Sequence, residues 1–327
     1  MDPKLINPKK ILVIKNDHIG DLIFYSGVFR ELKREYPKTR ITVIASKANK
    51  PIIEKNKDID EIIIMPHGKK FLKSFYKYPF ILNKIRREKF DIGFDLRGDF
   101  LNTFFLLYMG NVKYKIGFYT KFPSRFLLEH SEKRGLNNHE IDNMLKILNN
   151  GLGLNVKNNW PEIAIDSKDI KEAEDFIKKN RLKKFICIAF DSNTPARQWA
   201  LEEFDRVIKY LKKDYPEYQI VLCGIDEEKM NWLTKRNKNM IKLGKVNIRM
   251  IYPLLKRSSL TISLDNGISH IVWVGKTKLI VIQLKESIID HKNTEPLGKN
   301  SRTILETNEK VKAEKVIETV KSFLKKK

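Results

Sequence analysis

The 327-residue chain contains only two cysteines, Cys187 and Cys223. Both lie in apolar runs typical of strands, so we expect buried free thiols in a reducing compartment, and two cysteines are too few for a cysteine zinc site. A long apolar run is also missing, since the longest, residues 100–109, is about half of a membrane span. The first residues lack the apolar core of a secretion signal. These absences favour a cytoplasmic protein.

Acidic residues are scarce relative to basic ones. The 40 Asp and Glu stand against 64 Lys and Arg, which gives a net charge of +24. An excess of this size favours anionic partners, such as nucleic acid, acidic phospholipid or a phosphorylated glycan. A lysine-rich composition shared by a whole proteome would produce the same charge without any partner. Because nucleic-acid binding rests on charge alone, we do not expect nucleic acid as a partner.

Strand-like apolar runs alternate with amphipathic helical runs along the whole chain, which predicts parallel sheets covered by helices. The chain length favours two domains. We therefore predict two Rossmann-like, doubly wound α/β domains over residues 1–158 and 159–310, followed by a C-terminal helix over residues 311–327. The polar segment 155–166 marks the boundary. The predicted strands cover residues 11–14, 41–45, 61–65, 92–96 and 114–118, and then residues 185–190, 219–224, 260–265 and 278–283.

The loop over residues 15–21, with the sequence KNDHIGD, follows the first predicted strand. Ligands of such sheets bind outside the carboxyl ends of the strands, so this loop is a candidate site. Gly20 permits a close approach of the backbone to a ligand. Asp21 stands at the start of a helix, where a carboxylate serves as a cap or as a general base. Local sequence favours the cap.

A second turn of the same kind covers residues 263–270, with the sequence SLDNGISH. Backbone N–H groups at the start of the following helix would hold an anionic phosphate. Asp265 could accept hydrogen bonds from sugar hydroxyls. An aspartate cap followed by a glycine turn is the structural alternative.

Two further loops follow predicted strands and carry charge. The loop over residues 191–199 contains Arg197, which could neutralise the growing charge on a diphosphate leaving group. A solvent-exposed arginine is the alternative. The loop over residues 95–99 contains Arg97 and Asp99, which could shape a polar pocket or simply close a turn.

Taken together, these loops resemble those of glycosyltransferase family 9, the heptosyltransferase-like enzymes of bacterial lipopolysaccharide assembly. The similarity runs in family order over nearly the whole chain. The matching segments are ILVI at residues 11–14, DHIGD at 17–21, FDIGFDLRGD at 90–99, HE at 139–140, RQW at 197–199, CGIDE at 223–227 and DNGISH at 265–270.

The resemblance implies a metal-independent, inverting glycosyltransferase of the GT-B fold. It implies no cofactor, because the nucleotide-sugar donor is a substrate. The first domain would hold the acceptor and the second the donor, with ADP-heptose as the family default. Asp21 would be the general base that takes the proton of the acceptor hydroxyl. Glu227 would contact the ribose and Val246 the base of the nucleotide. The implied donor-binding residues are Ser192, Asn193, Arg197, Glu227, Val246, Asp265, Asn266, Gly267, Ile268 and His270, and the acceptor-side candidates are His18, Gly20, Arg97 and Asp99.

Three departures from the family pattern concern the donor. Asp191 stands where the family has a glycine-rich loop near the diphosphate, and Leu284 and Lys285 replace Phe-Gly. Arg197 replaces a lysine, which keeps the charge but changes the geometry of the hydrogen-bond donors. Asp191 and the missing Phe-Gly favour, as an alternative, a catalytically silent or regulatory nucleotide-sugar-binding protein, whereas the retained Asp21, Asp265 and His270 favour an enzyme. We expect transfer of a sugar, with heptose as the default, to a lipopolysaccharide core or another surface glycan. The basic surface allows peripheral contact with the anionic inner membrane.

Overall fold

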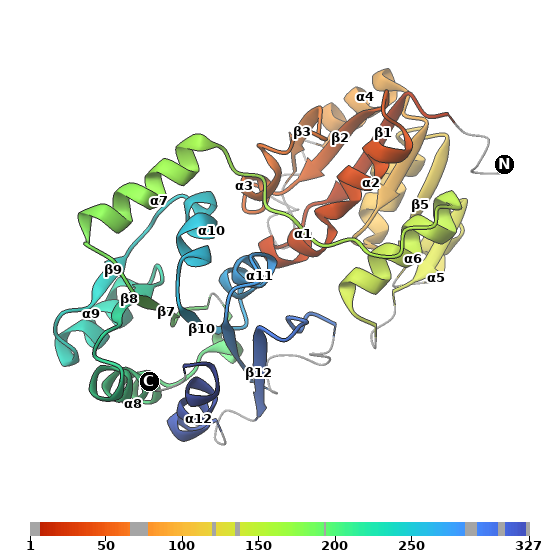
Figure 1. Cartoon of the computed structure of the whole chain (residues 1–327). Helices are drawn as coiled ribbons and strands as arrows, with labels where there is room; N and C mark the ends of the chain where they lie inside the picture. Colours follow the sequence, from red (N-terminus) through yellow and green to blue (C-terminus); the bar gives the residue numbers. More distant parts are fainter. Residues whose placement is uncertain are drawn as a thin grey trace. The chain divides into compact units, whose positions relative to one another are not determined.

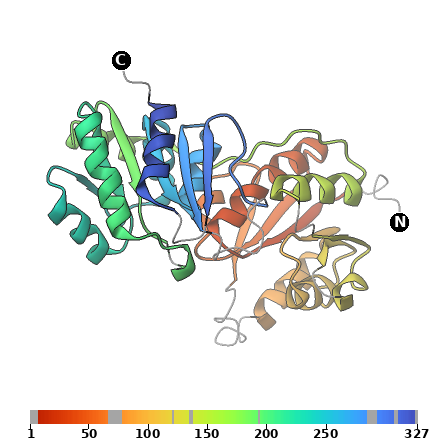
Figure 2. The ribbon, with the colours of Figure 1, turned by 90° about the horizontal axis from the view of Figure 1, so that it is seen from below.

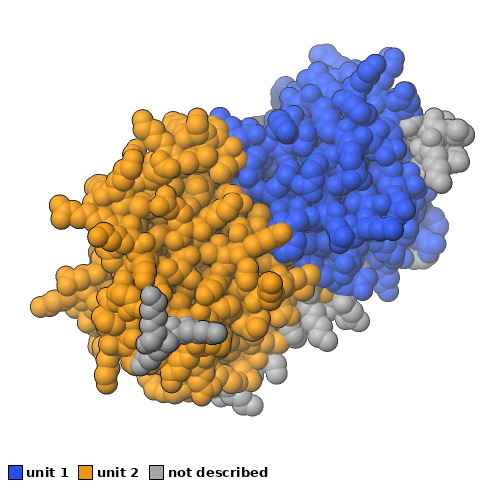
Figure 3. All heavy atoms as spheres, in the orientation of Figure 1, with its two compact units in different colours: residues 1–164 blue, residues 165–327 orange. Residues whose placement is uncertain are grey.

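The computed structural model describes residues 7–65, 78–119, 122–134, 138–192, 194–284, 293–306 and 311–324. The chain forms two compact units, residues 1–164 and residues 165–327, which are coloured separately in Figure 3. Each unit contains one six-stranded sheet with helices packed against it (Figure 1). The two Rossmann-like sheets expected from the alternating sequence pattern are confirmed.

The sheet of unit 1 is parallel throughout and has the strand order β3-β2-β1-β4-β5-β6. Its strands are β1 Lys10–Lys15, β2 Arg40–Ala45, β3 Glu61–Ile64, β4 Ile92–Asp95, β5 Tyr114–Tyr119 and β6 His130–Lys133. Its helices are α1 Ile19–Tyr25, α2 Gly27–Glu35, α3 Lys50–Ile53, α4 Tyr78–Glu88, the π-helix η4 Asn102–Tyr108, α5 Phe122–Arg125 and α6 Glu140–Leu152.

Both faces of this sheet are covered, which explains the uninterrupted apolar sequence of β1. Leu12 and Ile14 of β1 belong to a buried cluster with residues of α4 and η4. The alternate residues Ile11 and Val13 are equally buried and point to the opposite face, because side chains alternate along a strand. Figure 2 shows α1, α2 and α6 on one face of the sheet and α4 with η4 on the other.

The sheet of unit 2 is also parallel, with the order β12-β11-β10-β7-β8-β9. Its strands are β7 Phe185–Ala189, β8 Gln219–Cys223, β9 Ile241–Leu243, β10 Leu260–Leu264, β11 Leu279–Leu284 and β12 Ser301–Glu306. Its helices are α7 Ser167–Lys179, the 3-10 helix η5 Pro195–Arg197, α8 Leu201–Asp214, α9 Glu227–Arg236, α10 Ile248–Lys256, α11 Gly267–Val274 and α12 Ala313–Phe323.

The terminal helix α12 lies against its own unit, next to α8 and the strands β11 and β12 (Figure 2). Val316 and Val320 of α12 share a buried cluster with Phe204 of α8. The indole Nε1 of Trp199 donates a hydrogen bond to the carbonyl of Val311, 2.8 Å away. The last helix therefore completes the core of unit 2.

Each sheet places the first strand of its unit beside the fourth, β1 beside β4 and β7 beside β10. Counted within each unit, both orders read 3-2-1-4-5-6. At this point of a doubly wound sheet, the connections leave the first and fourth strands in opposite directions and open a crevice at their carboxyl ends. The loops that follow β1 and β4, and those that follow β7 and β10, are thus the candidate ligand loops of the two units.

All nine strands predicted from the sequence are present, and the structure adds three strands that the sequence pattern does not predict, β6, β9 and β12. These three strands lie at sheet edges, and each mixes buried with half-buried or exposed residues. An edge strand needs no continuous apolar run, because one side of it has no neighbouring strand and its side chains are less covered. Its sequence is therefore hard to distinguish from a loop.

The division between the units falls after Ala164. The segment before it is tied to unit 1, since Arg30 donates hydrogen bonds to Asn159 and, over 2.8 Å, to Glu162. The backbone N–H of Ala164 donates to Ile52 over 3.3 Å. Residues 159–164 therefore pack with the first unit.

Both cysteines are buried free thiols on strands of unit 2, as expected. Among the described residues, no helix has the length and apolar character needed to cross a bilayer.

Candidate functional site

Asp21 lies in the first turn of α1, directly after the loop that follows β1. The N-cap of this helix is His18, not Asp21. Asp21 nevertheless accepts a hydrogen bond from the backbone N–H of His18, which is the role of an acidic residue at the third helical position in a capping box. The helix-cap interpretation is thus met in part, while the carboxylate also lines a cavity.

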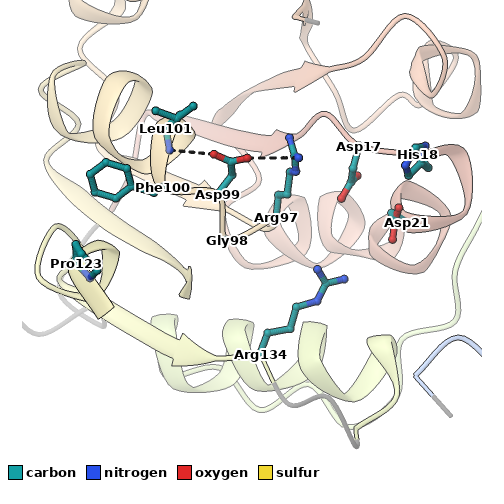
Figure 4. A pocket seen from close by; sticks show the side chains of 10 residues that line it. All are labelled: Asp17, His18, Asp21, Arg97, Gly98, Asp99, Phe100, Leu101, Pro123 and Arg134. Atoms are coloured by element: carbon teal, nitrogen blue, oxygen red, sulfur yellow. Dashed lines mark hydrogen bonds and ion pairs between the residues drawn. The ribbon is translucent and has the colours of Figure 1, made fainter. Parts of the chain in front are cut away.

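This cavity measures about 650 Å³, and its described lining residues all belong to unit 1 (Figure 4). Four of the predicted acceptor-side and catalytic residues line it: His18, Asp21, Arg97 and Asp99. Gly20 does not. The remaining lining residues are Asp17, Gly98, Phe100, Leu101, Pro123 and Arg134.

A buried lysine pairs with Asp17, one of the residues that line the cavity. The side chain of Lys15 is 0% exposed, and its Nζ lies 2.7 Å from Oδ2 of Asp17 and 4.4 Å from the centre of the Tyr25 ring. It also donates a hydrogen bond to the carbonyl of Leu96 over 3.2 Å. A buried ammonium requires partners of this kind, because removing it from water is costly.

The charges around Asp21 favour its ionised form. Burial by itself raises the pKa of the Asp21 carboxyl, but the positive charges of Lys15 and Arg134 outweigh this effect, so the pKa lies below its usual value. For Asp17 the balance is opposite: burial raises its pKa despite the neighbouring Lys15. Asp21 is therefore a carboxylate at neutral pH, in the state that a general base requires.

Arg134 is held in place by a chain of polar contacts. Its Nη2 lies 2.9 Å from Oε1 of Glu140, and the hydroxyl of Tyr25 donates to Oε2 of Glu140 over 2.8 Å. Figure 4 shows Arg134 pointing toward Asp17 and Asp21 from the opposite side of the cavity. From the sequence, Glu140 belongs only to a family motif, and Lys15, Asp17 and Arg134 are not among the predicted site residues.

The loop after β4 forms another wall of the cavity. Asp95 is buried and accepts hydrogen bonds from the backbone N–H groups of Arg97 and Gly98, both over 3.1 Å, and from the hydroxyl of Thr103 over 2.7 Å. Burial raises the pKa of Asp95 to about 6. Arg97 pairs with Asp99 at 3.4 Å. The loop thus both closes a turn around Asp95 and presents Arg97 and Asp99 to the cavity.

In unit 2, side chains from three elements surround Asp265, the residue after β10. Arg197 at the end of η5 lies 3.3 Å from Oδ2 of Asp265, and Gln283 of β11 donates to the same oxygen over 3.4 Å. His270 of α11 lies 3.7 Å from Oδ1. The structure thereby brings together three predicted donor-side residues, and it adds Gln283, which the sequence analysis missed because it belongs to another strand.

Asn266 is the N-cap of α11. Its Oδ1 accepts hydrogen bonds from the N–H groups of Ile268 over 2.9 Å and Ser269 over 3.2 Å, while its Nδ2 donates to the carbonyl of Asp191 over 2.8 Å. Gly267 is the first residue of the helix. The cap fixes the turn that follows β10 against the loop that follows β7.

The carboxylate of Asp191 is engaged with a neighbouring loop. Its Oδ2 accepts hydrogen bonds from the backbone N–H groups of Ile225 over 3.3 Å and Asp226 over 3.1 Å, and Lys229 lies 3.7 Å from Oδ1. These contacts partly neutralise the charge that the sequence analysis identified as a departure from the family. Through these hydrogen bonds, the loop after β7 contacts the segment just before α9.

The other predicted donor residues lie on loops at the same edge of the sheet. Ser192 follows Asp191, Glu227 is the first residue of α9, and Val246 lies between β9 and α10. Glu227 is exposed and Val246 is half-buried. Asn193, also predicted to bind the donor, and Lys285, one of the departures from the family, lie outside the described residues.

Two Rossmann-like units in one chain, each with polar loops at its switch point, form the GT-B fold. A family model described as glycosyltransferase family 9 (heptosyltransferase) matches residues 81–323. The chain belongs to this family and is a glycosyltransferase.

Relatives and solved structures agree with this assignment. The lipopolysaccharide core heptosyltransferase OpsX of Haemophilus influenzae is 24% identical over 285 residues, which cover 84% of this chain and 78% of that protein. A family 9 glycosyltransferase of Veillonella parvula has a TM-score of 0.84 at 18% identity, over 96% and 97% of the two chains. The E. coli heptosyltransferase WaaC, solved with ADP-2-deoxy-2-fluoro heptose, has a TM-score of 0.77 at 14% identity, over 96% and 100%.

Proposed function

We propose that this protein transfers heptose from ADP-heptose to a lipopolysaccharide core or another surface glycan, with inversion at the anomeric carbon and without a metal ion. Membership of the heptosyltransferase family supports the reaction. The complex of its structural relative WaaC with an ADP-heptose analogue supports the donor. The observation that carries the proposal is the position of Asp21 in the cavity of unit 1, where the positive charges of Lys15 and Arg134 lower the pKa of its carboxyl.

In this reaction the acceptor sugar occupies the cavity and presents a hydroxyl to Asp21. The hydroxyl oxygen attacks the anomeric carbon from the face opposite the diphosphate, and Asp21 accepts its proton as the new glycosidic bond forms. The bond between the anomeric carbon and the diphosphate breaks, and ADP leaves with the electron pair. Lys15 and Arg134 keep Asp21 ionised before the attack.

Unit 2 is the proposed donor side. Arg197 provides the fixed charge for the diphosphate, and the dipole of α11 adds a favourable partial positive charge at the start of the helix. Asp265, held between Arg197 and His270, is placed to accept hydrogen bonds from sugar hydroxyls. Because Asp191 is bound to the loop before α9, its presence gives no support to a catalytically silent protein.

Replacing the base tests the proposal directly. We expect Asp21→Asn to reduce turnover of ADP-heptose and truncated lipopolysaccharide about 100-fold to 10,000-fold, because an amide cannot accept the proton. Titration calorimetry should give an unchanged affinity for ADP. Asp142→Asn, at an exposed position of α6 in the same unit, is the matched control. Turnover of Asp21→Asn equal to that of the wild type would reject the assignment.

A membrane contact close to the acceptor cavity accompanies the proposal. Phe100, which lines the cavity, stacks on Phe104 with ring centres 5.8 Å apart, and Phe104 stacks on Tyr108 at 6.0 Å. Tyr108 is 54% exposed. Arg86 and Arg87 of the neighbouring α4 are exposed cations. Exposed aromatic rings beside cations favour the interface of an anionic bilayer.

Vesicle sedimentation tests this contact. We expect the protein to bind vesicles that contain phosphatidylglycerol and not vesicles of phosphatidylcholine alone. Tyr108→Ser should weaken the binding several-fold, since it removes an exposed aromatic ring. Equal binding to both kinds of vesicle, or an unaffected Tyr108→Ser variant, would exclude this surface as the membrane contact.

A further inference from the structure

Asp17 is a second carboxylate in the cavity of unit 1, and the proposed chemistry does not use it. The residue is only 6% exposed, and part of its side chain lines the same cavity as Asp21. Figure 4 shows both residues on one side of the cavity, with Arg134 opposite them. The two carboxylates are close enough for the charge of Asp21 to raise the pKa of Asp17.

Among the described residues, only one carboxylate oxygen of Asp17 has a hydrogen-bond partner. Oδ2 pairs with Nζ of Lys15 at 2.7 Å. Oδ1 is buried and has no hydrogen-bond partner among the described residues. A buried carboxylate oxygen without a hydrogen-bond donor destabilises the folded protein. Because other atoms of the Asp17 side chain line the cavity while Oδ1 itself is covered, a ligand in the cavity can supply the missing donor once the carboxylate turns Oδ1 toward it.

The chemistry of Oδ1 defines what that ligand offers. The ion pair with Lys15 stabilises the carboxylate form of Asp17, and a carboxylate oxygen only accepts hydrogen bonds, so its partner must donate one. Lys15 already balances the charge of Asp17, which makes a neutral hydroxyl a better partner than a second cation. A sugar ring carries several hydroxyls on neighbouring carbons, and two carboxylates on one side of a cavity can each receive one of them.

We infer that Asp17 binds a hydroxyl of the acceptor sugar next to the hydroxyl that Asp21 deprotonates, and that it thereby helps to select the acceptor. This inference rests on the proposed function, because it takes the cavity of unit 1 as the acceptor site. It assigns Asp17 to substrate binding, and Lys15 to holding Asp17 in place.

The experiment measures acceptor binding apart from transfer. Full-length wild type, Asp17→Asn and Asp17→Glu are titrated by calorimetry with a lipid-free oligosaccharide of the lipopolysaccharide inner core, in the absence of donor. Asp17→Asn removes the negative charge of the carboxylate that would accept the hydrogen bond. Asp17→Glu keeps this charge beside Lys15 but moves both carboxylate oxygens. We expect each variant to bind the oligosaccharide about tenfold more weakly, with unchanged affinity for ADP.

A residue that served only as the counterion of Lys15 would give a different result. Asp17→Glu would then bind the oligosaccharide as the wild type does, and Asp17→Asn would lose thermal stability without losing affinity. Either result overturns the inference, as does a wild-type protein that does not bind the oligosaccharide. If Asp17→Asn fails to fold, Asp17→Glu decides alone.

Failure of the proposed function is distinguishable from failure of this inference. A wild-type protein that binds the oligosaccharide but does not transfer heptose from ADP-heptose contradicts the proposed reaction. Weaker binding by both Asp17 variants in that same protein still supports the assignment of Asp17. In an active enzyme, the same loss should raise KM for the oligosaccharide about tenfold and change kcat much less.

Discussion

The first strands of the two sheets occupy the same place in the same strand order, yet they end in different residues. β1 ends in Lys15, a buried cation held by Asp17 and the ring of Tyr25. The residue after β7 is Phe190, which belongs to the apolar core of unit 2. The buried Lys15 requires acidic partners at the end of β1. Unit 1 therefore has a network of charged residues at a place where unit 2 has apolar core residues.

The fourth strands differ in a related way. Asp95 ends β4 and is enclosed by its own loop, with backbone N–H groups and Thr103 as donors. Asp265 follows β10 and is met by side chains of three other elements, among them Arg197 and Gln283. The strand order therefore decides where an aspartate stands, while the surrounding side chains decide whether it closes a turn or is available to a ligand.

The largest expected effect concerns Asp95 and stability. Its pKa of about 6 lies above the ordinary 3.8, so the folded state binds the proton more tightly than the unfolded state. The stability that this proton contributes is complete below about pH 4 and is lost as the pH rises through about 6, with a difference of about 3 kcal/mol. Asp95→Asn should remove this loss.

Thermal unfolding between pH 4 and pH 7 checks the prediction. The melting temperature of the wild type should fall relative to that of Asp95→Asn as the pH rises over this range. If the melting temperatures of the two proteins change with pH in parallel, the environment of Asp95 does not raise its pKa. The contrast between Asp95 and Asp265 would then be wrong.

The next effect concerns Asp265 and donor affinity. We expect Asp265→Ala to weaken binding of ADP-heptose about tenfold, because a carboxylate that accepts hydrogen bonds from sugar hydroxyls is removed. ADP has no such sugar, so its affinity should change less. Calorimetric titration with both ligands measures the difference. Asp21→Asn in unit 1 is the control, and an unchanged affinity of Asp265→Ala for ADP-heptose would reject the role of Asp265.

The smallest effect concerns Arg134 and the pH dependence of transfer. Arg134 contributes to lowering the pKa of Asp21, so Arg134→Gln should move that pKa upward and shift the acidic limb of the kcat/KM profile to higher pH. At neutral pH, where Asp21 stays ionised, the loss should be only about a few-fold. Arg134→Lys keeps the charge and should retain the wild-type profile. Identical pH profiles of kcat/KM for the wild type and both variants would show that Arg134 does not influence the pKa of Asp21.

Local sequence was sufficient for much of the fold and for part of the site. The nine predicted strands are present because buried parallel strands need apolar residues on both faces, a pattern visible within a few residues. The loops that carry Asp21, Arg97, Arg197 and Asp265 could be selected because each follows such a strand. The edge strands β6, β9 and β12 could not, since their sequences carry no continuous apolar run.

The amino-acid sequence by itself determined the two-unit α/β plan and the loops at the carboxyl ends of the strands. Only the tertiary structure decided the partners of the charged residues. Tyr25 and Glu140 are 115 residues apart in sequence and share a hydrogen bond, and Asp191 contacts amides 34 and 35 residues later. Such contacts depend on which strands become neighbours, and because burial strengthens electrostatic interactions, those neighbours set the charge state of each site residue.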